Sequence, residues 1–217
     1  MIKKIKEQLV YEVIKRRVAM KHPPFGAGEH MLLMRQDDYV RRCSILLALK
    51  SVVHEPVTGS LAEAGVYRGD TSQLIHDGAP ERRLYLFDTF EGFPVSDLEG
   101  RSDGRFNDTN EQLVRRKLGD SPNVVIRKGY VPDTFTGLEH ERFAFVLLDL
   151  DLYLPTKSSL DFFYPRLNRG AYLMVHDYNS LESSGACKKA VNEFMSDKPE
   201  RIVELSDVYG SMLIRKI

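Results

Sequence analysis

The sequence predicts a Rossmann-like α/β protein whose sheet has six parallel strands and one antiparallel strand at the C-terminus. From Gly59 to Ile217, apolar strand-like runs alternate with helical segments, and this alternation is typical of a parallel sheet. Only residues 206–210 separate the last two runs. Because this loop is too short for a helical crossover, we expect the final strand to run in the opposite direction.

The expected elements follow from apolar runs bounded by turn residues and from apolar residues at helical spacing. Strands are expected at residues 60–66, 83–87, 124–127, 143–148, 171–175, 202–205 and 211–215, with helices near 70–78, 109–118, 155–167 and 185–196. Two more helices are expected before them, at residues 2–19 and about 37–53. We therefore expect one domain overall: an N-terminal helical extension over residues 1–58 and an α/β sheet domain over residues 59–217.

The charge balance disfavours a nucleic acid or membrane partner. The 31 Lys and Arg residues equal the 31 Asp and Glu residues, so no global field attracts polyanions. The first helix is basic, which fits contact with an anionic surface, but a helix docked on the core with a solvated charged face is the preferred interpretation. The N-terminal helices are candidates for a homodimer contact or a cover over the site. A small-molecule partner is expected.

The chain is expected to be a soluble cytoplasmic protein. Its two cysteines, Cys43 and Cys187, are far apart in the sequence, and the N-terminus lacks the apolar segment of a signal peptide. No apolar run reaches the length needed to span a bilayer.

Acidic side chains follow two apolar strands at the point where each strand ends. Asp149 and Asp151 follow the fourth predicted strand, and His176 and Asp177 follow the fifth. Ligands of open α/β sheets bind at the carboxyl ends of the strands, so these four side chains are expected to converge on one crevice. A cluster of carboxylates suits a hard divalent cation, and the predicted metal ligands are Asp149, His176 and Asp177.

The turn after the first predicted strand suits a cationic cofactor better than a dinucleotide. Gly65 and Gly69 allow a sharp turn, but their spacing is not that of a pyrophosphate-binding loop, and Tyr67 fills a position where that loop needs room. Glu63 would repel a phosphate and attract an ammonium group such as that of S-adenosylmethionine. Asp88, at the end of the second strand, is placed to accept ribose hydroxyls. Glu63 and Asp88 also have simpler interpretations, as a helix-capping acid and as a turn residue that bonds the loop backbone.

Several separate motifs resemble the macrocin and mycinamicin type of sugar O-methyltransferases. They are AEAGVYRGDTS, LFDTFEGFP, KGYVPDTF, DLDLYLPT, HDY and GACKKAVNEF, and they extend roughly from Gly59 to Phe194. The resemblance implies a class I methyltransferase sheet and a methyl transfer, dependent on S-adenosylmethionine and Mg²⁺, to a hydroxyl that usually belongs to a sugar of a natural product. It matches Asp149 and Asp177 to metal positions. The cofactor-binding candidates are Glu63, Gly65, Tyr67, Gly69, Thr71, Asp88, Gly129 and Asp149.

One residue departs from the pattern of that family. His176 stands where the antibiotic-tailoring members carry an acid, and imidazole is a poorer ligand for Mg²⁺ than a carboxylate. The departure allows a different metal, a water molecule in that position, or loss of the metal. Asp149, Asp151 and His176 are the catalytic candidates for taking the acceptor proton.

Four alternatives remain open at this stage. His176 could act as the base of a metal-free methyltransferase, or be a packed residue at a strand end. The sheet could also serve a non-catalytic nucleotide- or carbohydrate-binding module. Residues 89–109, which are polar and contain several glycines, predict a lid over the site, with a surface insertion as the alternative.

Overall fold

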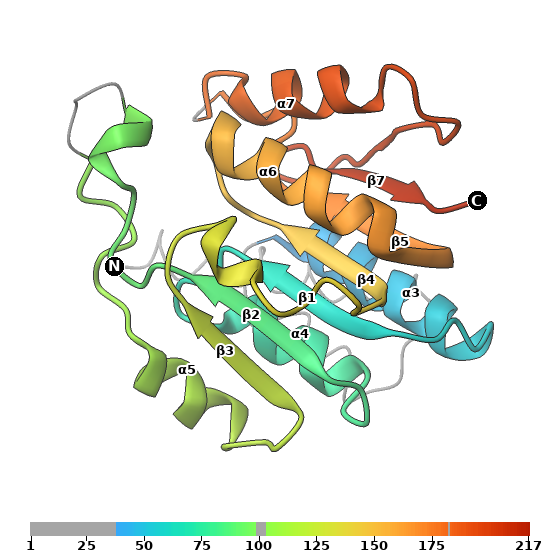
Figure 1. Ribbon diagram of the computed structural model, residues 1–217, viewed down its shortest axis with the longest axis horizontal. Coiled ribbons are helices and arrows are strands. Elements are labelled where there is room, and N and C mark those ends of the chain that lie inside the picture. Colours follow the sequence, from blue (N-terminus) through green and yellow to red (C-terminus); the bar gives the residue numbers. More distant parts are fainter. Residues whose placement is uncertain (1–37, 99–102, 182) are drawn as a thin grey trace, which may run out of the picture.

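A seven-stranded sheet in the order β3-β2-β1-β4-β5-β7-β6 forms the centre of the protein (Figure 1). The computed structural model describes residues 38–98, 103–181 and 183–217. The strands are β1 (Ser60–Ala64), β2 (Leu84–Asp88), β3 (Val124–Lys128), β4 (Phe143–Leu148), β5 (Leu167–Val175), β6 (Val203–Glu204) and β7 (Met212–Arg215). The α-helices are α3 (Tyr39–His54), α4 (Asp70–Gly78), α5 (Glu111–Leu118), α6 (Tyr153–Phe163) and α7 (Ala186–Met195), and the 3-10 turns are η1 (Val95–Leu98), η2 (Asp133–Phe135) and η3 (Tyr164–Arg166).

The strand directions confirm the predicted sheet. β1 pairs in parallel with β2 and β4, β2 with β3, and β4 with β5. β7 lies between β5 and β6 and is antiparallel to both, so β6 points the same way as β5. The short loop between β6 and β7 forces this reversal, because no helical crossover fits within it.

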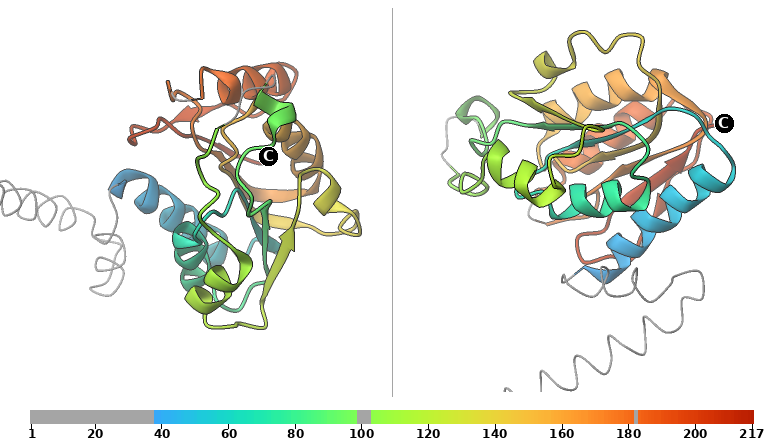
Figure 2. Two further views of the ribbon diagram at one scale, coloured as in Figure 1. Left: turned by 90° about the vertical axis from the view of Figure 1, so that its left-hand side faces the viewer. Right: turned by 90° about the horizontal axis from the view of Figure 1, so that it is seen from below.

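Helices cover both faces of the sheet. α3, α4 and α5 lie on one face, and α6 and α7 lie on the other (Figure 2). α3 confirms the helix expected at about 37–53, and its fully buried Ile45 and Leu49 pack against the sheet and α4. This part of the predicted N-terminal extension is therefore a layer of the same core. The basic helix predicted at residues 2–19 lies outside the described residues.

Several predicted boundaries were wrong by two to four residues. The helix expected near 155–167 is α6, which ends at Phe163, and Leu167 already belongs to β5. β1 ends at Ala64 rather than at residue 66, because Gly65 takes φ +89° and turns the chain. β5 begins at Leu167 rather than at residue 171. Its first residues include polar and partly exposed side chains, so this part of the strand is not an apolar run and does not give the pattern that predicts a strand.

The parallel strands bring their carboxyl ends to one edge of the sheet, where β1, β2, β4 and β5 each lead into a loop. Within the described ranges, no helix combines the length and the apolar character needed to cross a membrane.

Candidate active site

A cavity of about 640 Å³ opens at the carboxyl ends of the five strands β1 to β5. Most of the residues predicted for the site line this cavity, although these strands are far apart in the sequence. They are Glu63, Gly65, Tyr67, Thr71, Asp88, Gly129, Asp149, Asp151, His176 and Asp177.

Gly69, a predicted cofactor residue, is absent from the cavity lining. It has φ +74° and forms the N-cap of α4, and a Cβ there would lie 3.1 Å from Val114 of α5. Its role in the structure is to start α4 and to allow α5 to pack closely. Contact between Gly69 and the cofactor therefore stays a prediction.

Asp88 holds the turn between β1 and α4. Its Oδ2 accepts hydrogen bonds from the backbone N–H groups of Val66 (2.7 Å) and Tyr67 (2.8 Å), and its Oδ1 accepts one from Phe90 (2.6 Å). The simpler interpretation of Asp88, a residue that bonds loop backbone, thus describes what the structure shows. The carboxylate still lines the cavity, and each oxygen can accept more than one bond, so a ribose hydroxyl can be added.

Glu63 is almost completely buried at the bottom of the cavity, where the hydroxyl of Ser72 donates to its Oε2. Burial raises the pKa of Glu63 to about 8, with the charge of Asp149 adding to this and Ser72 and Arg41 opposing it. A buried acid without a cationic partner remains protonated at neutral pH. A ligand that brings an ammonium group would allow it to ionise.

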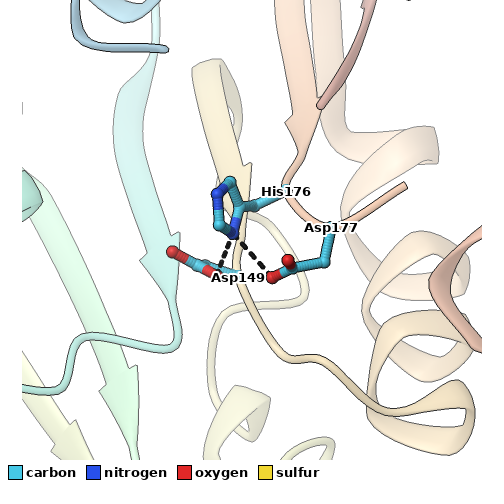
Figure 3. A group of neighbouring side chains, drawn as sticks. All are labelled: Asp149, His176 and Asp177. Carbon is cyan, nitrogen blue, oxygen red and sulfur yellow. Dashed lines mark hydrogen bonds and ion pairs between the residues drawn. The ribbon is translucent and has the colours of Figure 1, made fainter. Parts of the chain in front are cut away.

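Asp149, His176 and Asp177 form a tight cluster (Figure 3). The Nδ1 of His176 lies between the two carboxylates, 2.8 Å from Oδ1 of Asp149 and 2.6 Å from Oδ2 of Asp177. The chain turns sharply at this strand end, where Asp177 has φ +58°. The predicted convergence of β4 and β5 residues is confirmed for these three side chains.

The charges in this cluster stabilise one another. Burial lowers the pKa of His176, but the charge of Asp149 and the hydrogen bonds that the imidazole donates to both carboxylates outweigh burial and raise the pKa to about 10. Burial likewise raises the pKa of Asp149, but His176 and Arg41 hold it at about 2. Without a metal ion, His176 is therefore a cation enclosed by two carboxylates and has no free lone pair for a proton at neutral pH.

Asp151 lines the same cavity but is not part of that cluster of three. It has φ +59°, which places it in a turn beyond the end of β4. Burial, followed by the charges of Asp149 and Asp177, raises the pKa of Asp151 to about 8. The two acids of the DLD motif thus have opposite pKa shifts.

The cluster fits a divalent cation by its chemistry. One ligand atom from each of Asp149, His176 and Asp177 lies within 4.8 Å of the others. The Nε2 of His176 is buried and has no hydrogen-bond partner among the described residues, so nothing fixes the imidazole through that atom. Two carboxylates and one imidazole suit Mn²⁺, Fe²⁺, Co²⁺ or Zn²⁺ as well as Mg²⁺.

Arg41 of α3 is a site residue that sequence reasoning missed. Its Nη1 donates to Oδ2 of Asp149 (3.0 Å) and its Nη2 to the hydroxyl of Thr71 (3.1 Å). The available signal was a pair of arginines, Arg41 and Arg42, at the start of a helix whose other buried residues are apolar. Because α3 precedes β1 and has no motif, only the packed structure connects it to the strand ends.

Aromatic side chains from two loops were also missed. Tyr209, between β6 and β7, lies beside His176 with ring centroids 5.2 Å apart. That loop is connected to α3, because the N–H of Val208 donates to Asp38 (3.1 Å). Tyr130 lines the cavity and donates a hydrogen bond to Asp97.

The described part of the predicted lid forms one wall of the cavity. Phe93 and Phe106 line it and contact each other edge to face, with centroids 5.3 Å apart. Asp108 accepts hydrogen bonds from Tyr67 (2.7 Å) and from Arg68, which joins this segment to the β1–α4 turn. The segment is therefore positioned as a lid must be.

Sequence comparison relates this chain to one family. Residues 3–204 match the family described as macrocin O-methyltransferase (TylF). The 8-demethyl-8-(2,3-dimethoxy-alpha-L-rhamnosyl)-tetracenomycin-C 4'-O-methyltransferase of Streptomyces olivaceus is 29% identical, and the match covers 67% of this chain and 61% of that relative. The mycinamicin III 3''-O-methyltransferase of Micromonospora griseorubida is 26% identical, with 76% of this chain and 69% of the relative covered.

Solved structures share the fold. The O-methyltransferase NovP superposes with a TM-score of 0.69 at 23% identity, covering 82% of this chain and 80% of that one. An O-methyltransferase from Bacillus cereus in complex with SAH has a TM-score of 0.59 at 12% identity, covering 94% and 97%. These likenesses concern the fold alone.

Proposed function

Since this chain belongs to the macrocin O-methyltransferase (TylF) family, we propose that it transfers a methyl group from S-adenosylmethionine to a hydroxyl of a small molecule. The observation that carries this proposal is the cavity itself. It places a buried Glu63 beside the Asp149–His176–Asp177 cluster, so the groups that suit a cationic cofactor and those that suit a hydroxyl acceptor share one space.

The cofactor is expected to lie along the carboxyl ends of β1 and β2. Glu63 would receive its ammonium group, and Asp88 its ribose hydroxyls. Gly65 leaves room there, because a Cβ would overlap the backbone oxygen of Asp149. The complex with SAH in a relative of the same fold supports this choice of cofactor.

We place a divalent ion at Asp149, His176 and Asp177. When bound, such an ion lowers the pKa of a hydroxyl and so makes the oxygen a better nucleophile. The chain's own residues orient the acceptor, exclude water through residues of the lid segment 89–109, and take the proton. In this metal-bound site Asp149 and Asp151 are the candidates for the proton acceptor, because His176 would be a ligand of the ion.

The metal-free alternative, with His176 as the base, finds less support. A base must be unprotonated, whereas Asp149 and Asp177 hold the imidazole as a cation. A module that only binds nucleotides or carbohydrates would have no need for this cluster beside Glu63.

The acceptor is proposed to be a sugar of a glycosylated natural product, as the names of the two relatives suggest. The partly exposed ring of Tyr209 lies beside His176. An aromatic ring next to the reacting hydroxyl suits the apolar face of a sugar.

Labelled S-adenosylmethionine, a panel of glycosides and mass-resolved product detection test the transfer. We expect methylation of a sugar hydroxyl that stops in chelator and returns with Mn²⁺ or Mg²⁺. Asp149→Asn should lower the turnover by at least about 100-fold while cofactor binding stays nearly intact. Asp161→Asn, an exposed acid of α6, is the matched control.

Electron paramagnetic resonance of Mn²⁺ measures metal binding directly and so tests the metal site independently of turnover. Wild-type protein should bind the ion, and Asp177→Asn should bind it more weakly. Full turnover in chelator, together with an inactive His176→Ala variant, would replace the metal proposal by the metal-free one.

A further inference from the structure

Arg41 is the cation that reaches into the cavity beside both Glu63 and Asp149. Its side chain is 15% exposed, and burial lowers its pKa while Asp149 and other acids, Glu63 among them, raise it. A guanidinium has five N–H donors, of which Asp149 and Thr71 occupy two. Its buried Nε–H has no partner among the described residues. Arg41 therefore has donors left for a ligand.

The first turn of α4 brings together two recognition groups. Thr71 accepts a hydrogen bond from Arg41, and the next residue, Ser72, donates one to Glu63. Adjacent residues of one helix thus hold a buried cation and a buried acid side by side. An α-amino acid needs this spacing, because its ammonium and carboxylate groups are attached to the same carbon atom.

The other cations that line the cavity are less suitable for a ligand carboxylate. Arg42, the neighbour of Arg41 on α3, is buried and already has a partner. Arg68 pairs with Asp108 near the surface, and 45% of its side chain is exposed. His176 lies between Asp149 and Asp177. Acidic residues make up much of the remaining wall and would repel a carboxylate.

We propose that Arg41, with Thr71, binds the α-carboxylate of the methionyl part of the cofactor, while Glu63 binds the α-ammonium. This inference rests on the proposed function and adds to it the residue that recognises the amino-acid end. The N-terminus of α4, with its free backbone N–H groups, favours the same negative charge. Arg41 keeps its bond to Asp149, so the bound cofactor and the cluster share one guanidinium.

Two ligands that differ only in the carboxylate test this proposal by calorimetry on the full chain. The first is S-adenosylhomocysteine, and the second is its decarboxylated analogue, S-adenosyl-3-thiopropylamine. Wild-type protein should bind the first about 10- to 100-fold more tightly, the range expected for charge-assisted hydrogen bonds. Arg41→Gln should lose most of that preference and bind the decarboxylated ligand almost as well as wild type does.

Controls separate recognition from structure. Arg201→Gln changes an exposed arginine far along the chain and should keep the wild-type preference. Should Arg41→Gln fail to fold, Arg41→Lys and Thr71→Val are measured instead, and each must lower the preference at least threefold. An equal loss for both ligands, or an unchanged preference in these variants, overturns the role of Arg41.

The two proposals fail differently. If wild-type protein binds neither adenosyl ligand, the proposed function is wrong. If wild-type protein binds both with equal affinity, the cofactor assignment stands but the carboxylate site does not.

Discussion

Cofactor binding should release a proton from Glu63. In the ligand-free protein its pKa is about 8, so roughly nine in ten molecules carry the proton at pH 7. An ammonium group needs the ionised carboxylate. Removing the proton costs about 1.4 kcal/mol at pH 7 and about 0.4 kcal/mol at pH 8. The affinity for S-adenosylhomocysteine should therefore rise about ninefold from pH 6 to 7 and about fivefold from pH 7 to 8.

Asp151 lines the same cavity and also has a pKa of about 8, so the contribution of Glu63 is taken as the difference between wild type and a variant in which residue 63 does not titrate. Asp149 keeps its charge over this range because its pKa is about 2, and the pKa of Arg41 is raised. Calorimetry in two buffers with different ionisation enthalpies measures the proton directly. We expect release of about 0.9 proton at pH 7 and about 0.5 at pH 8.

Glu63→Gln is the matched variant, because the amide still accepts the hydrogen bond of Ser72 but does not titrate. Its affinity should rise much less with pH than that of wild type and should be roughly tenfold weaker than that of wild type at pH 8. This variant also corrects for titration of the cofactor. A pH-independent wild-type affinity, or equal proton release from both proteins, would refute the reasoning.

Stability should change with pH in the opposite sense to affinity. The folded pKa of Glu63 lies above the unfolded value of 4.5, so the folded state binds more protons between these values. This contribution is complete below about pH 4.5 and is lost as the pH rises through about 8. The ligand-free wild-type protein should lose melting temperature relative to Glu63→Gln between pH 6 and 8.

Three further predictions concern the framework. Gly65→Ala should lower the free energy of unfolding by about 3 kcal/mol or more, measured in urea, since the new Cβ would overlap the backbone of Asp149 at a residue with φ +89°. The control Gly104→Ala, with open space around the residue, should be near neutral. Equal urea midpoints for the two variants would contradict this prediction. Burial raises the pKa of Glu200, but the hydrogen bonds donated by Lys216 (2.6 Å) and Tyr164 outweigh burial and hold this pKa at about 2. Glu200→Gln should therefore lower the free energy of unfolding by about 2–3 kcal/mol at pH 7, and this deficit should shrink as the pH falls from about 4.5 to 2. A deficit that stays constant over this range would count against the assignment. Residues 89–109 should exchange amide hydrogens more slowly once cofactor and acceptor are bound, and exchange that ligands leave unchanged would favour a surface insertion over a lid.

Local sequence was sufficient for the sheet and for most of the site. Strands buried on both faces must be apolar, so a carboxylate directly after such a run indicates a strand end, and parallel strands bring their ends to one edge. This reasoning found Asp149, His176 and Asp177, which do converge. It also found the reversed strand β7, because the length of a loop limits what it can connect.

Tertiary structure decided what local patterns do not encode. Arg41 lies on a helix without a motif, and only the packing of α3 against the sheet brings it to Asp149, 108 residues away in the sequence. The protonation states of the site residues also depend on the tertiary structure. Asp149 and Asp151 are two residues apart and chemically identical, yet burial and neighbours lower the pKa of one to about 2 and raise that of the other to about 8. A pKa depends on distances to charges and on the loss of water, and these distances exist only in the folded chain.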